Sequence, residues 1–124
     1  HPVGAAAALA ALDETRRLDV VTNSADRGTQ LFNGMCALAG QYDLIGDVRG
    51  GHGLMAAMEL VSDRDSKTPI DGKLAIRMQK AAYEAGALIR VSGPNVIVSP
   101  SLIIDEADID FVLDAMEAGL KSIS

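Results

Sequence analysis

Residues 86–102 read GALIRVSGPNVIVSPSL, and the rest of the chain is interpreted as the scaffold of this stretch. Two apolar runs, residues 87–89 and 96–98, flank a Ser-Gly-Pro-Asn turn signal. This pattern predicts a strand, a tight loop and a second strand. Arg90 is the only charged residue of the stretch, and we place it at the end of the first strand. There its guanidinium can hold a carboxylate ligand or form a structural ion pair, and the residues alone leave both interpretations open.

Outside this hairpin, three stretches carry apolar residues at spacings of three and four, the period of an amphipathic helix. They are residues 20–39, 71–85 and 105–121. Two apolar runs, residues 44–48 and 54–61, predict strands joined by the glycine-rich residues 49–53. The polar residues 62–69 predict a surface loop. We therefore expect an α/β (α+β) fold in which helices cover one side of a small, mainly antiparallel sheet.

The start of the chain is rich in alanine. Pro2 suits the first position of a helix, and the alanines that follow favour helix while offering little side-chain volume on any face. Such a helix can pack closely on another backbone or on a larger domain that this chain does not contain. The chain also opens without a methionine. We expect a piece of a longer protein, with residues 1–18 as a connecting helix and residues 19–124 as a small α/β domain.

Composition narrows the kinds of partner. A chain of 124 residues, 48% of them hydrophobic, can form one packed domain. Its net charge of −6, without a cluster of lysine and arginine, argues against nucleic acid and anionic membranes, which attract concentrated positive charge. The longest uncharged apolar stretch near the start, residues 2–12, has about half of the ~20 residues needed to span a bilayer. The expected partner is a small molecule or another protein.

Other residues with chemical potential have structural explanations. Cys36 is the only cysteine, and its apolar helical surroundings predict a buried residue of a reduced, cytoplasmic protein. The sequence RGGHG at residues 49–53 lacks the spacing of a phosphate-binding loop, and a hairpin turn explains it better. His52 has no serine, cysteine or aspartate placed to work with it as a base. The histidines and the cysteine lack metal-ligand spacing, and all four lysines are expected to be solvated.

Six short motifs occur in a characteristic order. They are HPVGAAAALA at residues 1–10, GDVRG at 46–50, GLM at 53–55, MEL at 58–60, GALIR at 86–90 and VIVSPSL at 96–102. Their order and spacing resemble the C-terminal region of class III aminotransferases. These are pyridoxal-phosphate enzymes of fold type I, and they include the ω-amino-acid:pyruvate transaminases. The resemblance extends from His1 to about residue 120 and implies a small antiparallel sheet with helices packed on it.

The resemblance implies a role for Arg90. In the ω-transaminase branch, an arginine at the matching position holds the substrate carboxylate and can swing aside for uncharged amines. Arg90 is therefore our predicted substrate-binding residue. The implied small-molecule partners are an amine or amino acid and a 2-oxo acid such as pyruvate, and the implied assembly is a homodimer.

The resemblance also implies what this chain lacks. The lysine that carries the cofactor, the aspartate under the pyridine nitrogen and the ligands of the cofactor phosphate belong to the family's large domain, before the matched region. The family's Thr-x-x-Gly-His-Pro motif is cut just before His1, and RGGHG at residues 49–53 is one residue longer than the usual Arg-Gly-x-Gly. We therefore predict no catalytic, cofactor-binding or metal-binding residue in this chain. Pyridoxal phosphate is expected in the full-length enzyme and not on the chain alone. The alternative is a free-standing, non-catalytic α/β domain that dimerises through its alanine-rich helix.

Overall fold

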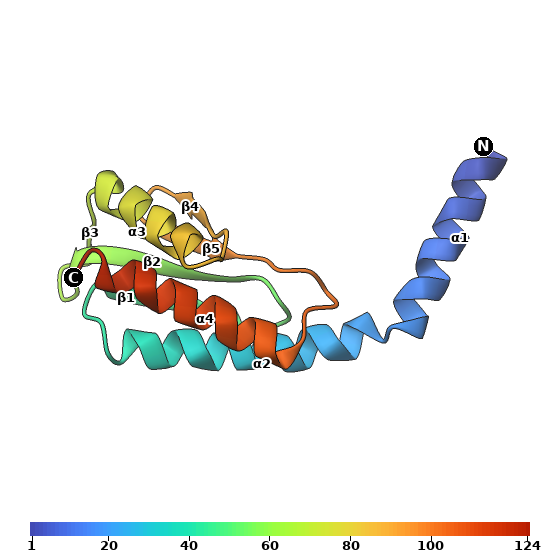
Figure 1. Cartoon of the computed structure of the whole chain (residues 1–124), viewed down its shortest axis with the longest axis horizontal. Helices are drawn as coiled ribbons and strands as arrows, with labels where there is room; N and C mark the ends of the chain where they lie inside the picture. Colours follow the sequence, from blue (N-terminus) through green and yellow to red (C-terminus); the bar gives the residue numbers. More distant parts are fainter.

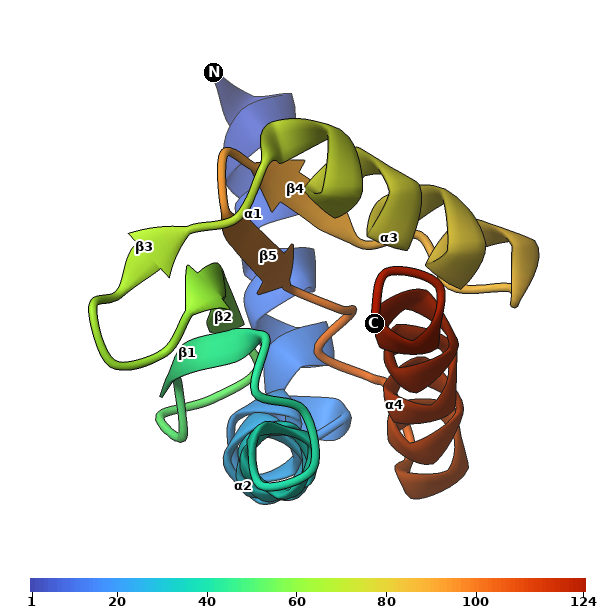
Figure 2. The same cartoon turned by 90° about the vertical axis from the view of Figure 1, so that its left-hand side faces the viewer.

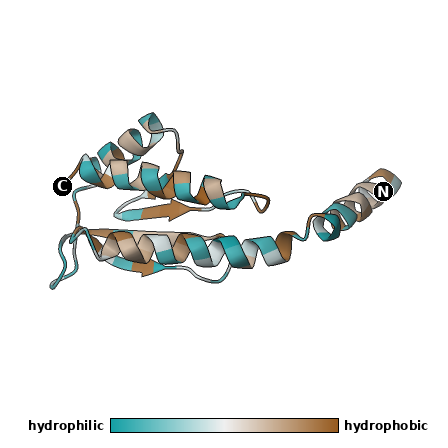
Figure 3. Cartoon of the chain, turned by 60° about the horizontal axis from the view of Figure 1, so that its bottom comes forward, coloured by the Kyte–Doolittle hydropathy of each residue, from teal (hydrophilic) through white to brown (hydrophobic).

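The computed structural model describes residues 1–124 and shows an N-terminal helix that stands apart from the rest of the chain (Figure 1). This helix, α1 (Pro2–Arg17), begins at the proline as expected and buries none of its residues. Figure 3 shows hydrophobic residues along it, with no neighbouring element that covers them. The role of residues 1–18 as a connecting helix stays a prediction. No helix of the structure combines the length and the apolar composition that a membrane crossing requires.

The remaining chain forms one antiparallel sheet and three helices. Four strands follow the spatial order β1 (Ile45–Arg49), β2 (Ala56–Asp63), β5 (Asn95–Val98) and β4 (Arg90–Ser92), and the short β3 (Thr68–Pro69) pairs with the end of β2. The helices are α2 (Val20–Ala39), α3 (Gly72–Glu84) and α4 (Glu106–Lys121), and they lie on one face of the sheet (Figure 2). The expected fold class is confirmed.

The hydrophobic core lies between this face of the sheet and the three helices. Fully buried side chains come from every layer: Leu31 and Met35 of α2, Met58 and Leu60 of β2, Met78 of α3, and Ile109 and Met116 of α4. Burying an aliphatic side chain of this size contributes about 1.5–3 kcal/mol. In β2, the buried Met58 and Leu60 alternate with the less buried Glu59, so that the strand presents its other side away from the helices.

Helices α3 and α4 begin where the sequence places them, each after an aspartate. Asp71 Oδ1 accepts a hydrogen bond from Lys73 N at 2.9 Å, and Asp105 Oδ1 accepts one from Asp108 N at 2.9 Å. A side-chain cap of this kind typically contributes about 1 kcal/mol, because it satisfies a backbone N–H that has no partner within the helix.

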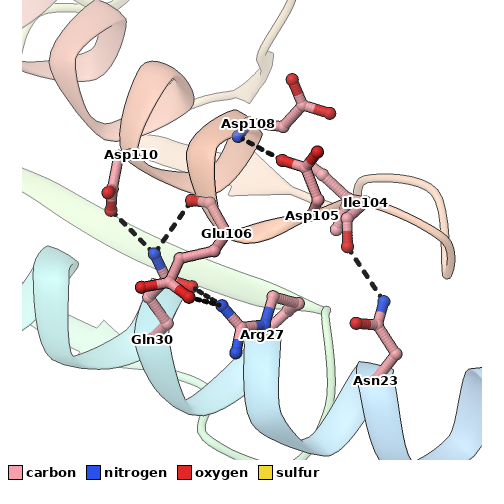
Figure 4. Close-up of polar contacts among 8 residues, drawn as sticks. All are labelled: Asn23, Arg27, Gln30, Ile104, Asp105, Glu106, Asp108 and Asp110. Carbon is pink, nitrogen blue, oxygen red and sulfur yellow. Dashed lines mark hydrogen bonds and ion pairs between the residues drawn. The ribbon is translucent and has the colours of Figure 1, made fainter.

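Polar side chains of α2 attach it to the start of α4 (Figure 4). Gln30 Nε2 donates to Glu106 O at 3.0 Å and to Asp110 Oδ1 at 2.7 Å. About two turns earlier on α2, Asn23 Nδ2 donates to Ile104 O at 2.9 Å. These contacts, together with the apolar core, hold the two helices side by side.

The first strand of the central hairpin begins later than the sequence predicts. Residues 87–89 are not a strand, and Arg90 is the first residue of β4 instead of the last residue of a strand. The backbone of this segment packs on α3: Ala87 N donates to Ala82 O at 3.0 Å, and Ile89 O accepts a hydrogen bond from Gln79. The ladder with β5 therefore begins only at Arg90.

The predicted burial of Cys36 is wrong, because the residue is exposed. The buried stripe of α2 passes through Gly28, Leu31, Met35 and Leu38. Cys36 follows Met35 directly, and one residue along a helix turns a side chain by about 100°. On α3 the apolar spacing predicts a buried stripe of Leu74, Met78, Ala81 and Ala85. The structure buries Ala75, Met78 and Ala82 instead.

The polar stretch of residues 62–69 contains more structure than a surface loop. Its last two residues form β3, and Lys67 adopts a positive φ of 55° before it. The Lys67 ammonium donates to Gly46 O of β1, so this lysine is not simply solvated as expected. Two residues that lie 21 positions apart in sequence are thereby joined, a contact that no local pattern indicates.

Candidate functional site

Arg90 lies on the face of the sheet that the helices leave open. Its ladder partner is Ile97 of β5, which pairs with Ala57 of β2, which in turn pairs with Arg49 of β1. Side chains of one cross-strand row point to the same face. The adjacent row contains the fully buried Val96 and faces the helices. Arg90 and Arg49 therefore stand at the two ends of one row on the open face.

The guanidinium of Arg90 has no partner within the chain. None of the ion pairs of the structure includes it. The arginine side chains that donate hydrogen bonds are those of Arg17, Arg27 and Arg49. Of the two interpretations open from the sequence, a structural ion pair within this chain is not formed. The Arg90 side chain is exposed and available to a group from outside the chain.

A cavity of about 530 Å³ lies beside Arg90, where the segment before β4 diverges from the end of β5. Leu88 and Val98 line its apolar part, and Phe111 of α4 contributes an aromatic side. Asp108 of α4 also lines it, so that the wall carries both signs of charge. Cavities of roughly 300–1,000 Å³ with a few convergent polar groups are typical of small-molecule sites.

The wall of this cavity depends on close packing at Gly86 and on a hydrogen bond from α3. Gly86 has a φ of 104°, and a Cβ added there would lie 2.7 Å from Cζ of Phe111. Glycine thus permits both the turn after α3 and the approach of the aromatic ring. Gln79 Nε2 donates to Ile89 O at 2.8 Å, which fixes the peptide immediately before Arg90.

Arg49, at the other end of the row, contacts three polar neighbours. Its Nη2 donates to Glu59 Oε2 and to Asn95 Oδ1, each at 3.0 Å, and its Nε lies 3.5 Å from Asp47 Oδ2. These contacts connect β1, β2 and β5 across the open face. From the sequence, Arg49 is predicted only as the first residue of the glycine-rich turn 49–53.

The glycine-rich turn is a hairpin connection, as predicted. It joins β1 to the antiparallel β2, and Gly51 and Gly53 have φ values of 86° and 91°. His52 is exposed and lines a smaller cavity of about 330 Å³ together with Ser24. No hydrogen bond connects these two side chains, so the arrangement provides no activated nucleophile. The structure also contains no group of three His, Cys, Asp or Glu side chains that could hold a metal.

The lysines of this chain do not fit the role of a cofactor-carrying residue. Lys67 donates to a backbone carbonyl, Lys80 lies 3.8 Å from Glu84 and Lys121 lies 3.0 Å from Glu117. No lysine lines the cavity beside Arg90 or the cavity beside His52. A Schiff-base lysine needs an enclosed site that favours its neutral form, and the side chains here are paired or exposed.

Sequence reasoning identified Arg90 but missed Gln79, which the structure brings to the same place. Gln79 precedes Arg90 by 11 residues on a helix whose polar positions all look solvated in the sequence. Glu59 and Asn95 were missed for the same reason, since the alternation of a strand shows only which side of it a residue occupies. No local signal could have found the three side chains.

Comparison with known proteins places these features in a family. The family described as Aminotransferase class-III matches residues 1–120. The taurine–pyruvate aminotransferase of Bilophila wadsworthia is 35% identical over 127 aligned residues, which cover 97% of this chain and 28% of that protein. The leucine/methionine racemase of Thermococcus litoralis is 32% identical, with 99% of this chain and 28% of that protein covered. This chain thus spans little more than a quarter of the length of these relatives.

A solved structure agrees with the sequence comparisons. An amine transaminase from an uncultivated Pseudomonas species, crystallised in its PLP-bound form, matches with a TM-score of 0.92 at 36% identity. The match covers 100% of this chain and 28% of that chain. The chain belongs to the class III aminotransferase family. The family identified from the motifs is confirmed.

Proposed function

We propose that this chain is the C-terminal part of a longer, pyridoxal-phosphate-dependent aminotransferase. The reaction is the transfer of an amino group between an amine or ω-amino acid and a 2-oxo acid such as pyruvate. Membership of the class III family over residues 1–120 supports this proposal, as does the coverage of only 28% of the taurine–pyruvate aminotransferase. Helix α1 adds support, because none of its residues is buried and a large domain would cover them.

The unpartnered guanidinium of Arg90 beside the cavity of about 530 Å³ is the observation that carries the proposed substrate class. A carboxylate placed there can accept two parallel N–H···O bonds from the guanidinium. Such charge-assisted contacts typically contribute about 1.5–3 kcal/mol. An amine without a carboxylate gains nothing from them. Because Arg90 is exposed on an edge strand, its side chain has room to turn away when an uncharged substrate binds.

The cofactor and its lysine come from the part of the protein outside this chain. When bound, pyridoxal phosphate supplies the electron sink for amino-group transfer. The lysines of this chain are paired or exposed, so no chemical step is assigned to them. The contribution of the chain is to bind the acceptor carboxylate and to orient the 2-oxo acid.

The assembly and the location of the full-length enzyme belong to the same proposal. A homodimer is supported by the motifs shared with the class III family. A cytoplasmic location is supported by the single Cys36, an exposed free thiol that suits a reducing compartment.

The test compares the two half-reactions of the full-length enzyme. Arg90→Ala should lower kcat/KM for pyruvate about tenfold to a hundredfold, since each 1.4 kcal/mol is a factor of about ten. The half-reaction with an amine that carries no carboxylate should keep its rate. Arg77→Ala is the matched control, because Arg77 of α3 is also exposed and also takes part in none of the ion pairs. Equal losses in both half-reactions would remove Arg90 from the substrate site.

A non-catalytic domain that dimerises through α1 is the second candidate, and the complete exposure of that helix favours it. Light scattering of the purified 124-residue chain distinguishes the two. A stable dimer without aggregation would support the interaction domain. Aggregation that ceases when the preceding large domain is present would support the aminotransferase.

A further inference from the structure

We propose that Gln79 is a positioning residue for Arg90, acting through the hydrogen bond from its Nε2 to Ile89 O. The inference rests on the proposed function, because it concerns the same carboxylate-binding arginine. According to this proposal, helix α3 orients the arginine that binds the substrate carboxylate. Neither the sequence motifs nor the list of cavity-lining residues indicates this role by itself. The contact joins two residues ten positions apart and measures 2.8 Å.

The backbone at Arg90 has few other constraints. Strand β4 contains only three residues and lies at the edge of the sheet, paired with β5 alone. The first ladder pair is Arg90 with Ile97, so the chain before Arg90 has left the ladder. The carbonyl of Ile89 belongs to the peptide group that also contains the N of Arg90. A hydrogen bond to this carbonyl therefore fixes the plane from which the Arg90 side chain departs.

The direction of the Arg90 guanidinium depends strongly on the peptide plane between Ile89 and Arg90, because no neighbouring side chain holds it. An arginine with ion-pair partners depends on its peptide plane less. Arg49 is held by three neighbouring side chains whatever its backbone does. Arg90 has none, so its orientation before substrate binds follows from its backbone and rotamer alone. Holding the arginine ready lowers the entropy lost when a carboxylate binds.

The donor is itself held rigidly. Gln79 is partly buried, and its neighbour Met78 is fully buried in the core. The start of α3 is capped by Asp71. On the other side, the Ile89 side chain is anchored in the core at 2% exposed, which leaves the tilt of the following peptide plane to the hydrogen bond from Gln79. Because the Gln79 side chain is held by α3, its hydrogen bond sets the orientation of the backbone at Arg90 relative to that helix.

The experiment uses the full-length enzyme and a double-mutant cycle. Gln79→Leu should raise KM for pyruvate about three- to tenfold, retain kcat at saturating pyruvate, and leave the half-reaction with a carboxylate-free amine unchanged. In an Arg90→Ala background the same substitution should add no further loss, because the residue acts through Arg90. Gln79→Met, which keeps the length but has neither an N–H nor a charge, should give the same KM effect if the leucine variant folds poorly.

Gln30→Leu is the matched control. Gln30 also donates from a helix to a backbone carbonyl of another element, Glu106 O (Figure 4), and neither residue lines the cavity beside Arg90. Removing this hydrogen bond should lower the unfolding temperature and leave KM for pyruvate unchanged. An equal KM effect from Gln30→Leu, additive losses in the cycle, or a silent Gln79→Leu would each overturn the positioning role. If Arg90→Ala itself left pyruvate kinetics unchanged, the proposed function would fail, and the positioning role with it.

Discussion

The two hairpins of the sheet carry one arginine each on the same open face, and the two arginines have opposite surroundings. Arg49, on the β1–β2 hairpin, donates to Glu59 and to Asn95 at 3.0 Å. Arg90, on the β4–β5 hairpin, takes part in none of the ion pairs. One hairpin pairs its positive charge within the sheet, while the other leaves its positive charge without a partner in this chain.

The two arginines differ in their surroundings because the next row of side chains on the open face carries charge at only one end. The row Ser92, Asn95, Glu59 and Asp47 crosses all four strands on the open face. Its two carboxylates stand at the β1–β2 end, beside Arg49. At the β4–β5 end it offers only the neutral Ser92 and Asn95, and the Asn95 oxygen already accepts a hydrogen bond from Arg49. A position next to a glycine-containing loop therefore does not make an arginine a binding residue. The carboxylates in the next row on the open face determine whether its guanidinium is already paired within the sheet.

The largest expected effect concerns the support of the β1–β2 hairpin by α2. A Cβ added at Gly28 would lie 2.3 Å from Gly53 O in the turn. Gly28→Ala should lower the free energy of unfolding by about 2–3 kcal/mol, because the obstacle is backbone and cannot rotate away. Urea denaturation followed by circular dichroism measures the change.

Gly4→Ala provides the control for this substitution. Gly4 lies on α1 with nothing within 4 Å of an added Cβ. Alanine there should stabilise α1 slightly, since glycine is about 1 kcal/mol less favourable than alanine in a helix. If Gly28→Ala had the same free energy of unfolding as the wild type, the glycine-rich turn would not be packed against α2.

A smaller effect tests the comparison of the two arginines directly. Arg49→Met leaves the Glu59 carboxylate, whose side chain is 32% exposed, without its ion-pair partner. We expect a loss of about 1–2 kcal/mol in the free energy of unfolding. Arg90→Met should change it by less than about 0.5 kcal/mol, because no partner is left behind. If the two variants were equally destabilised in urea, the distinction between a held and a free arginine would be lost.

The smallest effect is a dependence on pH at the β1–β2 end of the domain. Glu117 of α4 lies 3.0 Å from Lys121 Nζ and accepts a hydrogen bond from Tyr42 Oη at 3.0 Å. Lys121 first, and Tyr42 second, hold the pKa of the Glu117 carboxyl below its ordinary value of 4.5. A carboxyl with a lowered pKa in the folded state stabilises the fold above the unfolded pKa, and this contribution disappears as the pH falls through the folded value.

Glu117→Gln should therefore reduce the loss of stability between about pH 6 and about pH 3.5, measured as the urea midpoint at each pH. Glu14→Gln is the control, because Arg17 likewise lowers the pKa of the Glu14 carboxyl, but on the separate helix α1. Hydrogen exchange at low pH should rise near Tyr42 and not near Arg90. A uniform rise over both hairpins would contradict the separation of the two ends.

Local signals explain which predictions succeeded. Asp71 and the periodic apolar residues after it place α3 correctly, and the Ser-Gly-Pro-Asn turn places the β4–β5 hairpin, because capping and turn formation involve residues close in sequence. The start of β4 and the exposure of Cys36 were predicted incorrectly. Both features depend on how α3 and α2 are rotated about their own axes relative to the sheet. The spacing of apolar residues predicts this rotation only to within about 100°, the angle between successive side chains.

The sequence by itself determined the elements, the fold class, the family and the choice of Arg90. Tertiary structure decided which of the two arginines on the open face is paired, and it placed the Gln79 side chain against the peptide before Arg90. Glu59 and Asn95 lie 10 and 46 positions from Arg49 in sequence, and only the register of three strands brings them into contact. The physical reason is the two-residue period of a strand: a slip of one residue in β4 would turn Arg90 toward the helices and close the site.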